Sequence, residues 1–375
     1  MCIDSAFEHR ESTLDMSVTS AFTNGTSSEA ADGAARIGLL HGASYVGGEI
    51  IRILLAHPHA ELAAVTSRTF AGESLAEPHP ALRGQTDRSF IAPSEVPLED
   101  LDAILVAGEH GQSMHLIPDL LEAGFDGPIV DLSADFRFRD AAVYPEWFDV
   151  EHPAPELLSE AAYGLPEWMG GPGDAQIIAN PGCYATGITL ALAPLAAQDE
   201  PLSAHVTALT GASGSGAKPS SATHFPTRDG NVRPYKVLAH QHGPEILQTI
   251  GDHVDLNFVP ASGPWTQGIW GTAQVDWPSS GAAEAVTEWF EDAYGDAPLV
   301  RTSAGHLPSL QPTVDTPFCD VGWQRQDDTL VVGFALDNLL KGAASQAVQN
   351  LNLALDFPET AGLLPATTSA ERATA

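Results

Sequence analysis

The stretch R-I-G-L-L-H-G-A-S-Y-V-G-G-E-I-I-R-I-L-L-A-H-P, residues 36–58, decides the fold of this chain. Its first residues form a short apolar run typical of a buried strand, and its last form a helical pattern that ends at Pro58. Between the two lies the glycine-rich turn His41–Glu49. A strand, a glycine-rich turn and a helix in this order open a parallel α/β sheet, so we predict one here.

The next hundred residues continue the same alternation. We expect strands at 61–68, 102–108 and 128–135, and a helix at 115–124 with Pro118 in its first turn. Strands alternating with helices form a parallel sheet covered on both faces. Residues 36–182 are therefore predicted to form a Rossmann-type α/β domain.

After Asn180 the pattern changes to mostly strands. We expect helices from about Cys183 and at 282–294, and strands at 256–260, 269–277 and 330–336. Strand-rich sequence with few helices favours an α+β domain with a mainly antiparallel sheet, here residues 183–337. We expect a final helix, 338–356, to pack back on the first domain.

The two ends of the chain are predicted to be tails. Residues 1–35 are rich in Ser, Thr, Ala and acids without an apolar period, which predicts disorder, and residues 357–375 are predicted to be a second tail. Neither a secretion signal nor an apolar run long enough for a membrane helix is recognisable, so a cytoplasmic protein is expected.

The net charge of the chain argues against some classes of binding partner. With 49 Asp and Glu against 16 Lys and Arg, the net charge is -33, which argues against nucleic acid because that ligand requires a basic face. Only Lys218, Lys236 and Lys341 are lysines. Such a surface is typical of a protein from a halophilic cytoplasm, where salt screens self-repulsion.

Cys183 is the first candidate catalytic residue. The three cysteines show no C-x-x-C spacing, and the histidines form no metal-ligand cluster, so neither disulfides nor a metal are predicted. In N-P-G-C, Gly182 tolerates a strained turn and places Cys183 at a helix start. Because the helix N-terminus stabilises a thiolate, we expect an ionised nucleophile.

Tyr235–Ile246, Y-K-V-L-A-H-Q-H-G-P-E-I, holds the candidate acid–base residues. His240 or His242 is expected to transfer a proton near the thiolate, and Glu245 to orient the imidazole.

Two further sets of residues are expected to bind ligands. At the glycine-rich turn and after the second strand, where T-S-R-T replaces the acidic residue that selects NAD, we expect NADP(H) to contact Ser44, Tyr45, Val46, Gly47, Ser67, Arg68 and Thr69. The loop Gly211–Pro219 and the cations after it are expected to bind an anionic substrate through Ser213, Gly214, Lys218, Arg228 and Arg233.

Together these motifs resemble the N-acetyl-gamma-glutamyl-phosphate reductases and their relatives that act on substrates attached to an amino-group carrier protein. The resemblance runs from Ile37 to about Asn352 and rests on five segments: G-A-S-Y-V-G-G-E, T-S-R, N-P-G-C-Y-A-T, H-Q-H-G-P-E-I and D-N-L-L-K-G-A-A-S-Q-A-V-Q-N-L-N.

The resemblance implies an NADP-binding Rossmann domain and a second domain that carries the nucleophile and the contacts of a homo-oligomer. It implies that Cys183 attacks an acyl phosphate, that NADPH reduces the thioester to a semialdehyde, and that Asn338 lies near the nicotinamide. It assigns the acid–base role to His240, supported by Glu245, with His242 as the alternative.

The substrate branch is the finer question. S-G-S-G-A-K-P followed by H-F-P-T-R-D-G-N-V-R-P-Y resembles the carrier-protein branch, which reduces glutamyl or 2-aminoadipyl phosphate in arginine or lysine biosynthesis, and Arg228 and Arg233 would then meet an acidic carrier. The alternative substrate is the free N-acetylated phosphate.

One departure from the family pattern falls in the nucleotide turn. The glycine that the family places between Ser44 and Tyr45 is absent, which is expected to alter the pyrophosphate contacts. A non-catalytic NADP-binding protein, a cysteine hydrolase and an aspartate-semialdehyde dehydrogenase remain as alternative readings, although the C-terminal motif and H-Q-H-G-P-E disfavour the last.

Overall fold

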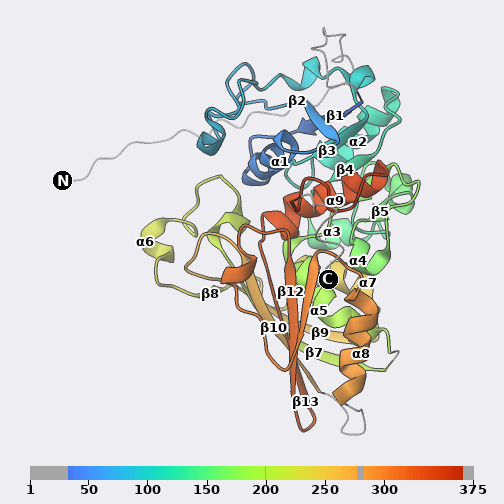
Figure 1. The fold of residues 1–375 in the computed structure, drawn as a ribbon, viewed down its shortest axis with the longest axis vertical. Coiled ribbons are helices and arrows are strands. Elements are labelled where there is room, and N and C mark those ends of the chain that lie inside the picture. Colours follow the sequence, from blue (N-terminus) through green and yellow to red (C-terminus); the bar gives the residue numbers. More distant parts are fainter. Residues whose placement is uncertain (1–32, 199, 277–282, 366–375) are drawn as a thin grey trace, which may run out of the picture.

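The computed structural model describes residues 33–198, 200–276 and 283–365. Within these ranges the chain forms two sheets (Figure 1), one built from the N-terminal half and one from residues after 200. The predicted tail 1–35 falls almost entirely on residues 1–32, which lie outside the described residues.

The first sheet is parallel throughout, in the order β2-β1-β3-β4-β6-β5. Its strands are β1 (Ala35–Leu40), β2 (Ala60–Val65), β3 (Ala103–Val106), β4 (Ile129–Asp131), β5 (Ala162–Tyr163) and β6 (Ile177–Ala179). The helices in this part of the chain are α1 (Tyr45–Leu55), α2 (Ser113–Glu122), α3 (Val143–Trp147) and α4 (Pro166–Met169).

The second sheet is mixed, in the order β11-β12-β13-β10-β7-β9-β8, with only β11–β12 and β7–β9 parallel. Its strands are β7 (Leu202–Thr210), β8 (Arg233–Pro234), β9 (Val254–Ser262), β10 (Ile269–Asp276), β11 (Val300–Ala304), β12 (Cys319–Gln326) and β13 (Thr329–Leu336). The accompanying helices are α5 (Cys183–Ala196), α6 (Phe225–Arg228), α7 (His242–Ile250) and α8 (Ala283–Tyr294). The predicted fold class is confirmed.

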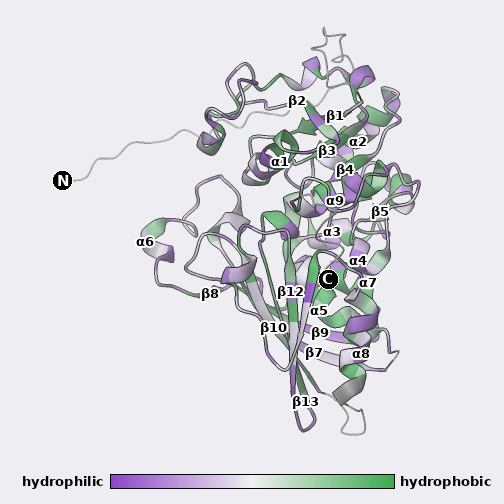
Figure 2. Ribbon diagram, viewed as in Figure 1, coloured by the Kyte–Doolittle hydropathy of each residue, from purple (hydrophilic) through white to green (hydrophobic). Residues whose placement is uncertain are grey.

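The helix α5 packs against the second sheet and forms the centre of its hydrophobic core. Every residue of α5 after Cys183 is buried, which fits a helix that carries no charged residue and whose polar side chains after Cys183 are limited to Tyr184, Thr186 and Thr189. Along β7 burial alternates, since successive side chains point to opposite faces of the sheet. In Figure 2, α8 carries both hydrophilic and hydrophobic colours, as expected of a helix with one solvent face.

The last helix returns to the first sheet. A π-helical turn, Leu340–Ala344, leads into α9 (Ser345–Ala354), and both contribute to the apolar cluster formed by β1, α1 and β4. Phe357 and Leu363 pack against the same cluster, so the segment predicted to be a C-terminal tail continues this packing up to the described limit at residue 365.

The position of Pro118 differs from the sequence expectation. The helix α2 begins at Ser113, so Pro118 lies inside it rather than in its first turn. The earlier start depends on Asp135, whose carboxylate accepts hydrogen bonds from the backbone N–H groups of Gly111 and Met114. This cap comes from a distant segment, which is why local sequence did not reveal it.

None of the helices in the described ranges combines the length and the apolar character that crossing a bilayer requires.

Candidate active site

A cleft of about 1120 Å³ lies where the two parts of the chain meet. Its walls come from the loops after β1, β2 and β3, the start of α5, the segment between β7 and α7, and residues 338–343. Ligands of open parallel sheets bind beyond the carboxyl ends of the strands, and these three loops are at those ends.

Cys183 lies in this cleft as the first residue of α5. The chain reaches it from β6 through Asn180, whose N–H donates to the Asp131 carbonyl of β4 at 2.8 Å. Gly182 has φ -70° and ψ 146°, which is ordinary extended backbone, so the strained turn predicted there is wrong. Glycine is required for another reason, because a Cβ at this position would lie 2.3 Å from Nε2 of His242.

The Cys183 thiol is protonated at neutral pH. Burial raises its pKa to about 11, while the charge of Arg137 and the N–H of Tyr184 act in the opposite direction without overcoming it. The prediction of an ionised thiol is therefore wrong for the free protein. The backbone N–H groups at the helix N-terminus lower the pKa as expected, and Arg137 adds to this effect, but desolvation outweighs both.

His240 and His242 line the same cleft with their rings 4.6 Å apart, centroid to centroid. Burial and the charge of Lys236 lower the pKa of His240 to about 4, and burial with its charged neighbours lowers that of His242 well below the usual value. Both rings are therefore neutral at pH 7. The backbone N–H of His242 donates to Nδ1 of the His240 ring at 3.2 Å. The proton of the neutral His240 ring is therefore on Nε2.

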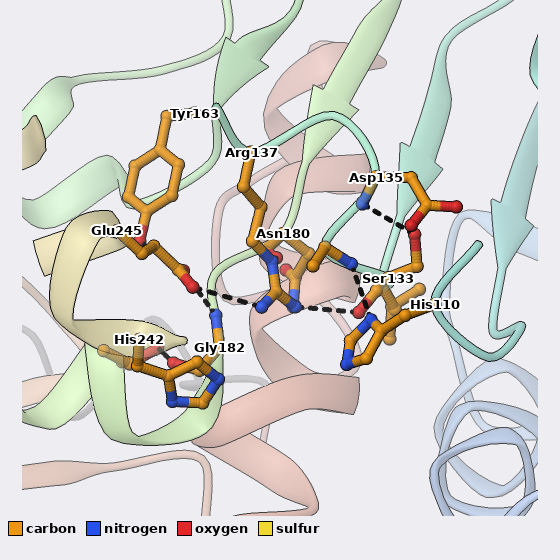
Figure 3. Close-up of polar contacts among 12 residues, drawn as sticks. His110, Ser133, Asp135, Arg137, Tyr163, Asn180, Gly182, His242 and Glu245 are labelled. Carbon is orange, nitrogen blue, oxygen red and sulfur yellow. Dashed lines mark hydrogen bonds and ion pairs between the residues drawn. The ribbon is translucent and has the colours of Figure 1, made fainter. Parts of the chain in front are cut away.

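Glu245 is buried, and its carboxylate is directed at Gly182 and Arg137 rather than at a histidine (Figure 3). Its carboxylate accepts from the N–H of Gly182 at 2.8 Å, from the Tyr163 hydroxyl at 2.8 Å and from Nη1 of Arg137 at 3.2 Å. Among the described residues no hydrogen bond joins it to either histidine, so its expected support of the imidazole is not found. It fixes the N-terminal turn of α5 instead.

Arg137 is a site residue that the sequence reasoning missed. It lines the cleft, is 5% exposed, and donates to the carbonyls of Asn180 and Leu132 as well as to Glu245. A signal existed in the sequence, because D-L-S-A-D-F-R-F directly follows a buried strand and carries a cation among acids. Its partner is more than a hundred residues away, and only the fold reveals it.

His110, in the loop after β3, was also missed. Its Nδ1 accepts from the Ala134 N–H at 2.9 Å (Figure 3), so the neutral ring carries its proton on Nε2. Its ring borders the cleft, yet the protein atoms around it and the nearby Arg137 lower its pKa to about 4. At the end of β4, burial and the neighbouring Asp135 raise the pKa of Asp131 to about 6.

The predicted nucleotide residues line the cleft, with one exception. Those that line the cleft are Ser44, Tyr45, Val46, Ser67, Arg68, Thr69 and Asn338. Gly47 does not: its N–H donates to Oγ of Ser44, and a Cβ there would lie 2.3 Å from the Gly42 carbonyl oxygen. Gly47 thus permits close packing of α1 on the turn.

The shortened turn keeps the features that a dinucleotide requires. Ser44 caps α1, whose first N–H groups have no partner within the helix, and Nε2 of His79 bonds the Gly42 carbonyl at 2.8 Å. Arg68 is exposed at the cleft, where a cation fits a phosphate. Asn338 is fixed by Gly268 N–H at 2.6 Å and by Ser213. These residues fit a nicotinamide dinucleotide.

All five predicted substrate residues border the same cleft, on its second-domain side. Lys218 and Arg233 are exposed at its edge, whereas Ser213 and Arg228 are buried. Within the described residues, no group of three or more His, Cys, Asp or Glu side chains is arranged to hold a metal ion.

Two family models match this chain, one to each part. The semialdehyde dehydrogenase NAD-binding domain matches residues 36–172, and the semialdehyde dehydrogenase dimerisation domain matches residues 183–338. The second match supports assembly of the chain with copies of itself.

Relatives of similar length match along most of the chain. An N-acetyl-gamma-glutamyl-phosphate reductase of Methanopyrus kandleri is 41% identical over 335 residues, covering 87% of this chain and 97% of that protein. One of Rubrobacter xylanophilus is 42% identical, covering 87% and 98%. A Thermomicrobium roseum protein with the provisional name LysW-L-2-aminoadipate 6-phosphate reductase is 39% identical, covering 87% and 97%.

Solved structures share the fold at low sequence identity. Aspartate semialdehyde dehydrogenase II of Vibrio cholerae, complexed with ASA, aligns with a TM-score of 0.66 at 15% identity, covering 86% of this chain and 98% of that one. The Candida albicans aspartate semialdehyde dehydrogenase with NADP aligns with a TM-score of 0.61 at 15% identity, covering 86% and 98%. From the family models and the relatives, the chain belongs to the semialdehyde dehydrogenase family, among the N-acetyl-gamma-glutamyl-phosphate reductases and their relatives, and is a nicotinamide-dependent oxidoreductase.

Proposed function

We propose that this chain reduces an acyl phosphate to the semialdehyde with NADPH, through a thioester on Cys183. The observation that carries the proposal is the position of Cys183, which begins α5 inside a cleft shared by the dinucleotide turn and the two neutral histidines. A cysteine at a helix N-terminus beside neutral imidazoles has the arrangement that activated nucleophiles need.

The Cys183 sulfur forms a bond to the acyl carbon, and the bond from that carbon to the phosphate oxygen breaks. Because the resting thiol is protonated, its proton must leave as the sulfur attacks, and a neutral imidazole accepts it. His240 would take this proton on Nδ1, giving up the hydrogen bond from the backbone N–H of His242. Phosphate departs with a proton from solvent, and a thioester remains. NADPH, when bound, supplies the hydride that reduces this thioester.

We assign the acid–base role to His240, with His242 as the alternative. The imidazolium formed in the first step returns its proton to the oxygen of the reduced adduct. That hydroxyl then loses its proton to the same ring, the carbon–sulfur bond breaks, and the semialdehyde leaves. The sulfur recovers the proton, so the protein ends as it began. Glu245 and Arg137 take no proton in this scheme and hold the turn at Gly182.

NADP(H) is assigned to the first-domain end of the cleft. Ser44, Tyr45 and Val46 would hold the pyrophosphate at the start of α1, Ser67, Arg68 and Thr69 would hold the 2'-phosphate, and Asn338 would lie at the nicotinamide end.

For the substrate we propose a glutamyl or 2-aminoadipyl phosphate attached to a small acidic carrier protein, in arginine or lysine biosynthesis. The support is local charge: between Gly211 and Gln241 the chain has Lys218, Arg228, Arg233 and Lys236 against Asp229 alone, although its overall charge is -33. The free N-acetylated phosphate is the alternative, favoured by the names of the relatives from Methanopyrus and Rubrobacter.

The reverse reaction tests both the thioester route and the choice of substrate. NADP and phosphate are supplied with N-acetylglutamate semialdehyde or with the same semialdehyde conjugated to a carrier protein, and the absorbance of NADPH is followed in concentrated salt. The proposal expects a higher kcat/KM for the conjugate, and a drop in that advantage when Arg233 is replaced by Gln. Equal or better use of the free compound assigns the alternative. Cys183→Ser should abolish turnover with either, and retained turnover would refute the thioester route.

A further inference from the structure

His41 has a backbone conformation that is unusual for a residue with a side chain. It directly follows β1 and has φ 60°, in the left-handed region that favours glycine, at the point where dinucleotide-binding turns place their first glycine. A residue other than glycine in this region is a pointer to a functional site. The His41 side chain is half-buried and lines the cleft, so a ligand in the cleft can reach it.

The backbone at His41 is bonded to the segment that follows β2. The N–H of His41 donates to Oγ1 of Thr66 at 3.1 Å, and the N–H of Gly42 donates to the Thr66 carbonyl at 2.9 Å. Thr66 directly precedes Ser67 and Arg68, which are assigned above to the 2'-phosphate of NADP(H). The turn after β1 is therefore joined directly to the residues that would contact the adenosine ribose.

The imidazole of His41 packs against the loop after β3. Its Cδ2 atom would be 3.4 Å from a Cβ placed on Gly108, the second residue after β3. Burial lowers the pKa of the ring, the charge of Arg68 lowers it further, and the charge of Glu109 raises it. The ring is thus within electrostatic range of Arg68, which is exposed at the cleft.

The ring of His41 has unused hydrogen-bonding capacity. Among the described residues, neither of its nitrogens has a hydrogen-bond partner. The rings of two nearby histidines differ in this respect: Nε2 of His79 donates to the Gly42 carbonyl, and Nδ1 of His110 accepts from the Ala134 N–H. An unpartnered imidazole on a cleft wall, close to a cation, fits a ligand with anionic oxygen acceptors.

We propose that the His41 imidazole binds the adenosine 2'-phosphate of NADP(H) together with Arg68, and so favours NADP over NAD. The inference rests on the nucleotide position assigned under the proposed function. The 2'-phosphate is the group that NADP carries and NAD lacks, and it lies at the end of the second strand in this type of domain. The pyrophosphate belongs instead at the start of α1, which begins at Tyr45, beyond the His41 turn.

The experiment compares the binding of oxidised NADP and NAD by isothermal titration, at one concentration of KCl and at pH 8, where a phosphate monoester is fully charged. His41→Asn removes the imidazole and introduces a residue that tolerates a positive φ. We expect its affinity for NADP to fall about 10- to 100-fold, the range for a hydrogen bond to a charged group, and its affinity for NAD to stay the same. His41→Gly should give the same loss.

His79→Gln is the matched control, because it changes another imidazole of the same turn whose Nε2 is bonded to the backbone at Gly42. It should leave the ratio of the two affinities unchanged. An equal loss for NADP and NAD in His41→Asn would mean that the ring contacts a part common to both or only supports the turn, and would overturn the proposal. Unchanged or tighter binding of NADP by His41→Asn would overturn it as well.

Arg68→Gln separates this inference from the assignment on which it rests. If Arg68→Gln loses the preference for NADP and His41→Asn keeps it, the 2'-phosphate lies where it is assigned and the role of His41 is wrong. If neither variant changes the ratio, the assigned nucleotide position is wrong too. A protein that shows the His41-dependent preference but oxidises no semialdehyde keeps this inference and refutes the proposed reaction.

Discussion

Glu245 accepts a hydrogen bond from the backbone N–H of Gly182 at 2.8 Å, and this bond ties α7 to the turn that places Cys183. The same carboxylate is paired with Arg137, whose Nε donates to the Asn180 carbonyl two residues before Gly182. The buried ion pair therefore hydrogen-bonds the cysteine turn at two places, the Gly182 N–H and the Asn180 carbonyl. It holds the turn from which Cys183 begins α5.

Removing one member of this pair should be costly. Arg137→Met leaves the Glu245 charge buried without its partner, and we expect the free energy of unfolding to fall by about 3–5 kcal/mol in urea titrations. Adding Glu245→Leu should recover part of that loss. The exposed pair Arg301–Asp320 is the control, where Arg301→Met should cost about 1 kcal/mol or less. Similar losses of stability at the two pairs would contradict a larger contribution from the buried pair Arg137–Glu245.

Alkylation of the cysteine should be slow at neutral pH. Since the pKa of the Cys183 thiol is about 11, the rate of its reaction with iodoacetamide should keep rising with pH up to at least pH 10, without a plateau near 8. Peptide mapping distinguishes Cys183 from Cys319, which is fully buried. A plateau at or below pH 7 would restore the ionised thiol that the sequence alone suggested.

The two histidines should differ in their effect on turnover. We expect His240→Asn to lower kcat by about 10²- to 10⁴-fold, with a smaller effect of His242→Asn, because we assign proton transfer to His240. With a pKa near 4, His240 stays neutral at pH 5, so the acid limb of kcat/KM should lie well below pH 6.5. The larger loss in His242→Asn would transfer the role to that ring.

The folded protein should lose stability in mild acid. Folding lowers the pKa of four buried histidines, so the unfolded chain binds more protons between about pH 6.5 and 4, and their contribution is complete above pH 6.5 and lost on acidification. These four are His57, His152, His240 and His242. Asp131 and Asp337, whose pKa values folding raises, act in the opposite direction below about pH 6.

His41, His79 and His110 also have lowered pKa values, so the histidines outnumber the two carboxyls, and the free energy of unfolding should fall between pH 6.5 and 5. Urea titrations at both pH values measure it. His57→Gln, which keeps an amide donor for the Asn352 side chain, should make the pH dependence shallower. Constant stability across this window would contradict the lowered pKa values.

Concentrated salt should stabilise the fold. A net charge of -33 repels itself at low ionic strength, and the Debye length falls from about 10 Å at 0.1 M to about 3 Å at 1 M. We expect the melting temperature to rise steeply between these concentrations of KCl. Sucrose at matched osmolarity is the control for general exclusion effects, and an equal rise in sucrose would argue against charge screening.

Several features followed from local pattern alone. The period of apolar residues around the glycine turn predicted β1 and α1, and the strand-rich texture after residue 200 predicted the second sheet. Cys183 at a helix start and the placement of His240 and His242 beside it were likewise readable, since N-P-G-C and H-Q-H are short motifs.

Three features could not be predicted from the sequence: the ionisation of Cys183, the partners of Glu245 and the presence of Arg137 in the site. Each depends on residues far apart in the sequence, for instance the 108 positions between Arg137 and Glu245. A helix dipole can be inferred from a motif, but desolvation depends on every atom that packs around the sulfur.

The sequence by itself determined most of the helices and strands of this protein, because the spacing of apolar residues and the residue types in turns are local patterns of a few residues. Only the tertiary structure decided which charges meet: among the described residues it gave Arg137 a carboxylate partner and gave Arg228 none. The physical reason is that burial and ion pairing are properties of three-dimensional proximity, and the same residue type has opposite consequences depending on which partner the fold provides.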